Sequence, residues 1–88
     1  MPKKRLPKVE WKETKPLLHG SRQWESTDGL FRYQCIDRYD DIPMSPTYNL
    51  YQFKGGEWNR VFEGRSRAKM INTARIRKQL IEESEDQE

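Results

Sequence analysis

The pair Gly55-Gly56 constrains the fold of this 88-residue chain more than any other feature of the sequence. It separates two segments, 48–53 and 58–62, that are rich in the aromatic and aliphatic residues typical of strands. Two adjacent glycines suit the type I′ turn of a two-residue hairpin, because both central positions of that turn require φ > 0. The turn predicts that Phe53 pairs with Trp58, and this register decides which side chains share a face.

The predicted register collects four aromatic side chains on one face of the hairpin: Tyr51, Phe53, Trp58 and Phe62. On the other face it pairs Leu50 with Val61. Only 33% of the residues are hydrophobic, so a chain of this size has little else to bury. We therefore expect the aromatic face to be the core. The alternative is an exposed platform on which unpaired bases stack.

A second hairpin is predicted around Asp28-Gly29, a strong turn signal between segments 22–27 and 30–38. The second of these segments alternates, and the face with the larger apolar side chains should be buried. That face carries Phe31, Tyr33 and Cys35. Val9 and Trp11 fit a short edge strand. Residues 39–47 are acidic and contain prolines, which predicts a loop.

A single helix is predicted from residue 67 to residue 82, with Ser66 as its N-cap. Met70, Ala74 and Ile81 form a narrow apolar stripe along it, while Ile76 falls on the opposite side. The predicted fold class is α+β, with a small antiparallel sheet of three to four strands followed by one C-terminal helix. We expect one domain over residues 9–82, a basic flexible arm over 1–8 and a disordered acidic tail over 83–88.

Positive charge is concentrated in the arm and the helix. Residues 65–81 carry six lysine and arginine residues and no acidic residue, although their charges are spread around the helix. With a net charge of +3, this pattern is typical of a polyanion-binding protein. Phosphate contacts need no sequence motif, so we expect DNA or RNA to bind the helix and the hairpin. The expected contact residues are Lys54, Arg60, Arg65, Arg67, Lys69, Arg75, Arg77 and Lys78, with Lys3, Lys4 and Arg5 of the arm.

No motif in the sequence indicates an enzyme, a cofactor or a metal. Nucleophilic catalysis requires a nucleophile beside a base, and nothing in the sequence pairs His19 with Cys35. A structural zinc site requires four such ligands, and these are the only histidine and cysteine. One cysteine and no long apolar run indicate an intracellular, cytoplasmic protein without a membrane segment. We therefore expect a non-enzymatic binding protein.

The order of strands, glycine hairpin and basic helix resembles the three-strand-plus-helix domains at the N-termini of phage-type integrases. In outline it is also similar to double-stranded-RNA-binding folds. Tyr48 to Phe62 and the helix start at Ser66–Ala68 carry this resemblance. It implies a small phage-like domain that binds nucleic acid.

Two other functions fit the same residues. One is a phage-type protein-interaction module, an inhibitor or adaptor of a host enzyme, that docks through its acidic segments 37–41 and 82–88. The other is a structural subunit that self-associates by pairing edge strands between copies. The sequence leaves the oligomeric state open.

Overall fold

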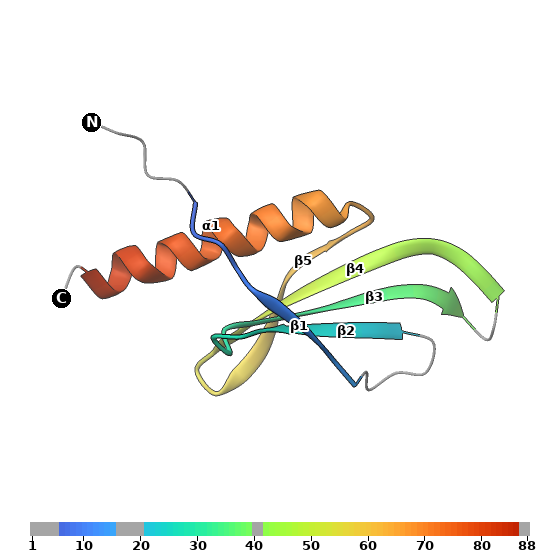
Figure 1. Ribbon diagram of the computed structural model, residues 1–88, viewed down its shortest axis with the longest axis horizontal. Coiled ribbons are helices and arrows are strands. Elements are labelled where there is room, and N and C mark those ends of the chain that lie inside the picture. Colours follow the sequence, from blue (N-terminus) through green and yellow to red (C-terminus); the bar gives the residue numbers. More distant parts are fainter. Residues whose placement is uncertain (1–5, 16–20, 40–41, 87–88) are drawn as a thin grey trace.

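The computed structural model describes residues 6–15, 21–39 and 42–86, and Figure 1 shows their arrangement. Five antiparallel strands follow one another in a meander of order β1-β2-β3-β4-β5, and one helix follows the last strand. The elements are β1 (Trp11–Thr14), β2 (Ser21–Ser26), β3 (Phe31–Tyr39), β4 (Ile42–Lys54), β5 (Glu57–Gly64) and α1 (Arg67–Asp86). The predicted α+β class is confirmed, with five strands in the sheet rather than three to four.

The predicted loop at 39–47 is wrong, because most of it belongs to β4. β3 continues to Tyr39, and β4 begins at Ile42. β4 contains Pro43 and Pro46, which cannot donate a ladder hydrogen bond. They are tolerated because the ladder with β5 reaches only to Tyr48, so this part of β4 has β3 on one side and a free edge on the other.

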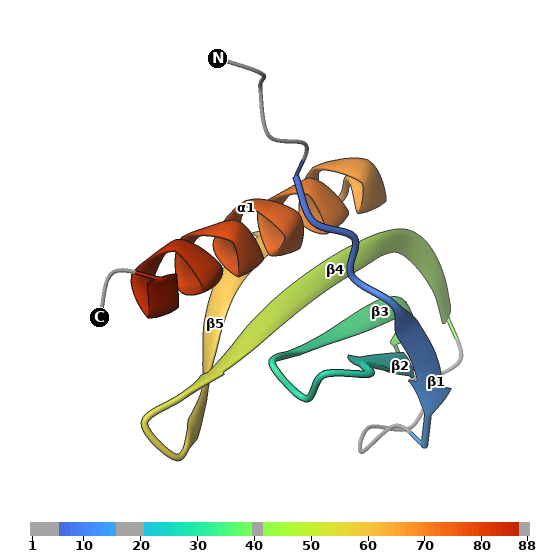
Figure 2. The same cartoon turned by 60° about the vertical axis from the view of Figure 1, so that its left-hand side comes forward.

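Helix α1 lies across one face of the sheet, over β4 and β5 (Figures 1 and 2). The main-chain N–H of Lys69 donates to Ser66 Oγ at 3.2 Å, which confirms the predicted N-cap. Met70 and Ala74 are fully buried, whereas Ile76 is 43% exposed, as the stripe predicted. The helix ends at Asp86, so the predicted end at residue 82 came too early and the acidic segment begins within α1.

The core lies between α1 and the middle of the sheet. Phe31 and Tyr33 of β3 are buried there, as predicted, together with Leu50 of β4. These three side chains share a face because Tyr33 is paired with Leu50, and Phe31 lies two residues along β3. The core is therefore formed by one face of the sheet and the apolar stripe of α1.

The predicted register of the β4–β5 hairpin holds at the turn and fails beyond it. Phe53 pairs with Trp58 and Tyr51 with Arg60, as expected. Leu50 then pairs with Phe62 instead of Val61, because β5 carries one extra residue, a β-bulge. The bulge turns Phe62 to the helix side, where it packs on the core.

The aromatic face of the hairpin is not the core, which corrects the favoured interpretation. Phe53 is 43% exposed, whereas Leu50 and Gln52 on the other face of β4 are buried. The reason is the pairing of β4 with β3: Leu50 and Gln52 lie opposite Tyr33 and Phe31, on the face that α1 covers.

The chain before β1 crosses α1 (Figures 1 and 2) and is held there by two basic side chains of the helix. Arg75 donates from Nε to the carbonyl oxygen of Pro7 at 3.1 Å and from Nη2 to that of Leu6 at 3.0 Å. Lys78 Nζ donates to the carbonyl oxygen of Lys8 at 3.1 Å. Of the predicted arm over 1–8, these three residues are described, and α1 fixes each of them.

We predict that Leu50→Ala lowers the free energy of unfolding by about 2–5 kcal/mol, because it leaves a cavity in a fully buried site. Phe53→Ala, on the other face of the same strand, should lower it by less than about 1 kcal/mol. Urea unfolding followed by circular dichroism measures both values. The opposite ranking would show that the aromatic face is the core.

Candidate nucleic-acid interface

The predicted cations do not form one patch, because three of the five basic residues on α1 stabilise the fold. Arg75 and Lys78 hold the N-terminal segment, and Arg77 Nη1 donates to Gln52 Oε1 at 3.1 Å. Their charged groups lie between elements of the fold, so we expect them to contribute little to nucleic-acid binding. Lys3, Lys4 and Arg5 lie outside the described residues.

The start of α1 presents the remaining helix cations to solvent. Arg65, Arg67 and Lys69 are exposed, and none of them forms an ion pair within the described part of the chain. They directly follow β5 in sequence. A ligand bound along β5 would therefore meet this positive group at the end of the strand.

Lys54 and Arg60, the two hairpin cations, lie on opposite faces of the sheet. Lys54 belongs to the face of Gln52, which α1 partly covers, whereas Arg60 is paired with Tyr51 on the other face. Arg60 Nη1 lies 3.2 Å from Glu63 Oε2 in an exposed ion pair. The predicted continuous patch of helix and hairpin is thus divided by the sheet.

The sheet face away from α1 gathers aromatic side chains and arginines, and we call it the open face: Arg32, Tyr51, Phe53, Trp58 and Arg60. The guanidinium of Arg32 stacks on Trp58, with its Cζ 4.3 Å from the ring centroid. The rings of Phe53 and Trp58 lie 5.2 Å apart and are tilted by 60°. Phe53 and Arg60 are exposed, whereas Arg32, Tyr51 and Trp58 are half-buried.

Acidic residues neutralise part of this charge. Arg32 Nη2 lies 2.8 Å from Glu25 Oε1, and both side chains are about one-quarter exposed. This pair helps to hold the guanidinium over the Trp58 ring, so the cation and the ring form one preorganised surface. Glu25 and Glu63 would compete with a phosphate for the two arginines.

A row of polar side chains crosses the sheet beside the open face. Cross-strand pairing aligns Thr14, Gln23, Gln34 and Asn49. Gln23 Nε2 donates to Thr14 Oγ1 at 3.1 Å, and Gln34 Nε2 donates to Gln23 Oε1 at 3.2 Å. The amides of this row are buried, and Asn49 Oδ1 has no hydrogen-bond partner among the described residues. This face of the sheet is therefore polar at its centre and aromatic towards the β4–β5 turn.

Arg32 was not among the predicted contact residues, although the sequence contained the signal for it. It lies between Phe31 and Tyr33, which were predicted to point inward, so strand alternation places Arg32 outward. Its contact with Trp58 joins β3 to β5, which are not neighbours in the sheet. Only the tertiary structure shows that contact.

Asp28, in the turn between β2 and β3, connects the sheet to α1. Its Oδ1 accepts from Ser26 Oγ at 2.6 Å and from the N–H of Leu30 at 3.0 Å, and its Oδ2 lies 3.2 Å from Lys78 Nζ. Burial alone would raise the pKa of Asp28, but these hydrogen bonds and the Lys78 charge outweigh it. The pKa is therefore lower than that of an ordinary aspartate.

Of the two residues considered for catalysis and zinc binding, His19 and Cys35, the structure describes Cys35. Cys35 is buried and lies next to Tyr48. Burial raises the pKa of the Tyr48 hydroxyl, and the neighbouring Cys35 side chain raises it further. His19 lies outside the described residues. No cluster of three or more histidine, cysteine or acidic side chains among the described residues could hold a metal ion. No helix in this part of the chain is long and apolar enough to cross a membrane.

Comparison with known proteins finds no family model that matches this chain, and no significant match to a curated protein or a solved structure.

We predict that Asp28→Asn lowers the free energy of unfolding at pH 7 by about 1–2 kcal/mol, since it weakens hydrogen bonds to a charged group. A folded-state pKa below the unfolded value stabilises the fold above about pH 4, and this contribution is lost as pH falls through the folded pKa. The variant should therefore lose less stability between pH 5 and pH 2. Urea unfolding of both proteins across that range tests this. The prediction is contradicted if the free energy of unfolding falls with pH by the same amount in the variant and in the wild-type protein.

Proposed function

We propose that this protein binds single-stranded nucleic acid on the open face of its sheet. The observation that carries the proposal is the group of Tyr51, Phe53 and Trp58 on the sheet face away from α1, where Phe53 is exposed and the other two rings are half-buried. Every nucleobase has a flat π-face, so exposed aromatic rings bind unpaired bases with little sequence preference. A duplex hides those faces in its own stack, which favours a single strand as the ligand.

The charges of the open face support the same ligand. Arg32 lies beside Trp58, and Arg60 lies beside Tyr51 on the neighbouring strand. A base stacked on one of these rings would place its phosphate near an arginine. Arg65, Arg67 and Lys69 extend the positive charge beyond the end of β5. The contact set thus includes part of the predicted helix but not its interior cations.

The buried polar row makes the sheet rigid and does not itself contact the nucleic acid. Hydrogen bonds join Thr14, Gln23 and Gln34 across three strands. Such bonds fix the curvature and spacing of the sheet beneath the open face. Aromatic side chains held on a rigid sheet lose little entropy when a base stacks on them.

We predict that a fluorescently labelled oligo(dT) binds with a dissociation constant on the order of micromolar at low salt. If about three phosphates are neutralised, affinity should fall roughly 20-fold between 50 and 200 mM salt, at a slope of about 0.7 per phosphate. Fluorescence anisotropy measures both quantities. A duplex of the same length should bind more weakly, and equal or tighter duplex binding would argue against stacking on the open face.

Removal of one ring should weaken oligo(dT) binding by about tenfold in Phe53→Ala and by more in Trp58→Ala, because each stacked base contributes about 1–3 kcal/mol. Leu80→Ala is the matched control, since Leu80 is an exposed apolar side chain on α1. This variant should bind oligo(dT) with unchanged affinity. Circular dichroism establishes that each variant is folded. Unchanged affinity in both aromatic variants would exclude the open face, and a loss in Arg67→Ala instead would assign binding to the helix start.

Glu63→Gln should strengthen binding by about two- to threefold, because it frees Arg60 from its ion pair for a phosphate. The gain should disappear at high salt, where phosphate contacts are screened. The same anisotropy titration measures it. A weaker complex would mean that Arg60 does not contact the nucleic acid.

A further inference from the structure

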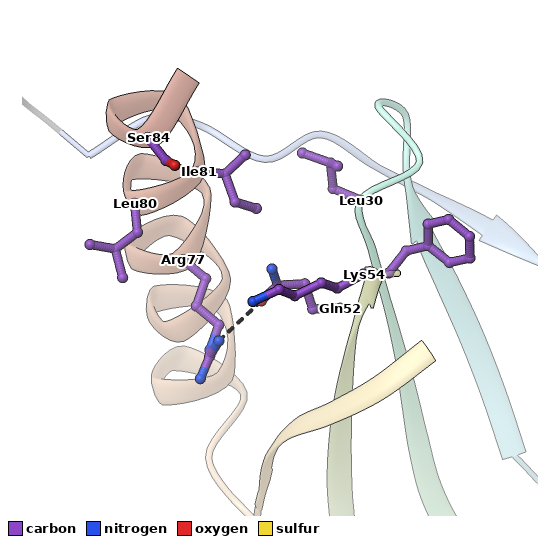
Figure 3. Close-up of a pocket in the computed structure, with 8 residues that line it drawn as sticks. Leu30, Gln52, Lys54, Arg77, Leu80, Ile81 and Ser84 are labelled. Atoms are coloured by element: carbon purple, nitrogen blue, oxygen red, sulfur yellow. Dashed lines mark hydrogen bonds between the residues drawn. The ribbon is translucent and has the colours of Figure 1, made fainter. Parts of the chain in front are cut away.

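A pocket of about 440 Å³ lies between the C-terminal half of α1 and the turn end of the β4–β5 hairpin (Figure 3). The helix contributes one stripe of side chains spaced three and four residues apart: Arg77, Leu80, Ile81 and Ser84. The sheet side contributes Leu30, Gln52, Phe53 and Lys54. The pocket thus lies on the face that α1 covers, away from Tyr51 and the arginines of the open face.

One part of the pocket wall is apolar. Leu80 is 58% exposed, and Ile81 and Leu30 are partly buried at the margin of the core. In Figure 3 the side chain of Ile81 points from the helix towards Leu30 across the opening. An aliphatic chain placed here would bury the exposed side of Leu80 and contact the other two side chains.

The other part of the pocket is positively charged. Lys54 extends from the hairpin and Arg77 from the helix into the space between them (Figure 3). No described carboxylate forms an ion pair with either side chain. Two cations that line one pocket repel each other, so an anion between them would lower the energy of both.

Gln52 supplies a third, oriented donor. Its side chain lines the pocket although the residue is only 8% exposed. Its Oε1 accepts a hydrogen bond from Arg77 Nη1 at 3.1 Å, which orients the amide. Nε2 then carries N–H groups that have no hydrogen-bond partner among the described residues. Lysine, arginine and this amide are all donors, so the polar end of the pocket selects an acceptor-only group.

We propose that this pocket binds a monocarboxylate attached to an aliphatic chain. The carboxylate has two oxygens for the donors of Lys54, Arg77 and Gln52, and the chain covers Leu30, Leu80 and Ile81. A fatty acid and a peptide C-terminus with aliphatic last residues both offer this chemistry. The site goes beyond nucleic-acid binding and does not depend on it, because Phe53 is the one residue of the open face that also lines the pocket.

Titration of the full-length chain with decanoate, followed by amide chemical shifts in NMR, tests the proposal. We expect saturable shifts at Leu30, Leu80 and Ser84 and at the side-chain amide of Gln52, with a dissociation constant on the order of 100 µM. Decanol lacks the charge and acetate lacks the chain, so each should bind at least about tenfold more weakly. Decanol binding as tightly as decanoate, or acetate doing so, would overturn the proposal.

A second titration distinguishes the two sources of the ligand. N-acetyl-Leu-Leu with a free carboxylate is compared with its C-terminal amide, which removes the charge and keeps the side chains. Tighter binding of the free peptide than of decanoate assigns the site to peptide C-termini, and the reverse assigns it to fatty acids. Either result supports the proposal, whereas equal binding of the free peptide and its amide contradicts it.

Lys54→Gln should weaken decanoate binding by about five- to tenfold without unfolding the protein, because Lys54 is exposed at the hairpin tip. Lys69→Gln is the matched control, since Lys69 is an exposed cation of α1 outside the pocket, and its affinity should not change. Equal affinity in the wild-type protein and Lys54→Gln would refute the carboxylate contact. Oligo(dT) binding by Lys54→Gln, measured in parallel, shows whether the open face is independent of the pocket.

Discussion

The extra residue in β5 is the constraint on which the two faces of this protein depend. The hairpin turn sets the pairing of Phe53 with Trp58, and a regular ladder would continue with Val61 opposite Leu50. Because of the bulge, Phe62 instead of Val61 lies opposite Leu50. The alternation of β5 is therefore reversed beyond the bulge, and Phe62 points towards α1. Phe62 then joins the core, while Trp58 stays on the other face with Phe53. A strand without the bulge would have placed Phe62 and Trp58 on the same side.

The core explains why the aromatic side chains near the turn are left outside. Phe31, Tyr33 and Leu50 already fill the centre of the covered face, and Met70 and Ala74 of α1 close it. Trp11 and Trp24 pack on Tyr33, with ring centroids 4.7 and 4.8 Å from its own. The β1 end of the sheet supplies much of the buried aromatic surface. Of the hairpin aromatics Tyr51, Phe53, Trp58 and Phe62, only Phe62 packs on the core among the described residues.

Three of the five basic residues of α1 stabilise the fold. Arg75 and Lys78 hold the chain before β1, and Lys78 also reaches Asp28 in the β2–β3 turn. Segments at opposite ends of the sequence are joined through these contacts, because α1 runs past both of them. The helix therefore connects these segments, and its cations that have no partner among the described residues lie in its first turn, next to Arg65.

The sequence determined the elements, and the tertiary structure determined the use of their faces. The glycine turn, the alternation around Tyr33 and the Met70–Ala74 stripe are local patterns, so the sequence predicted the α+β class, the inner face of β3 and the helix stripe. The bulge, the strand nature of Pro43 and Pro46 and the contact of Arg32 with Trp58 could not be predicted in this way. Each depends on which strand lies beside which, and on a covered face that exists only once α1 has packed. The same packing decides which cations are free to meet a ligand.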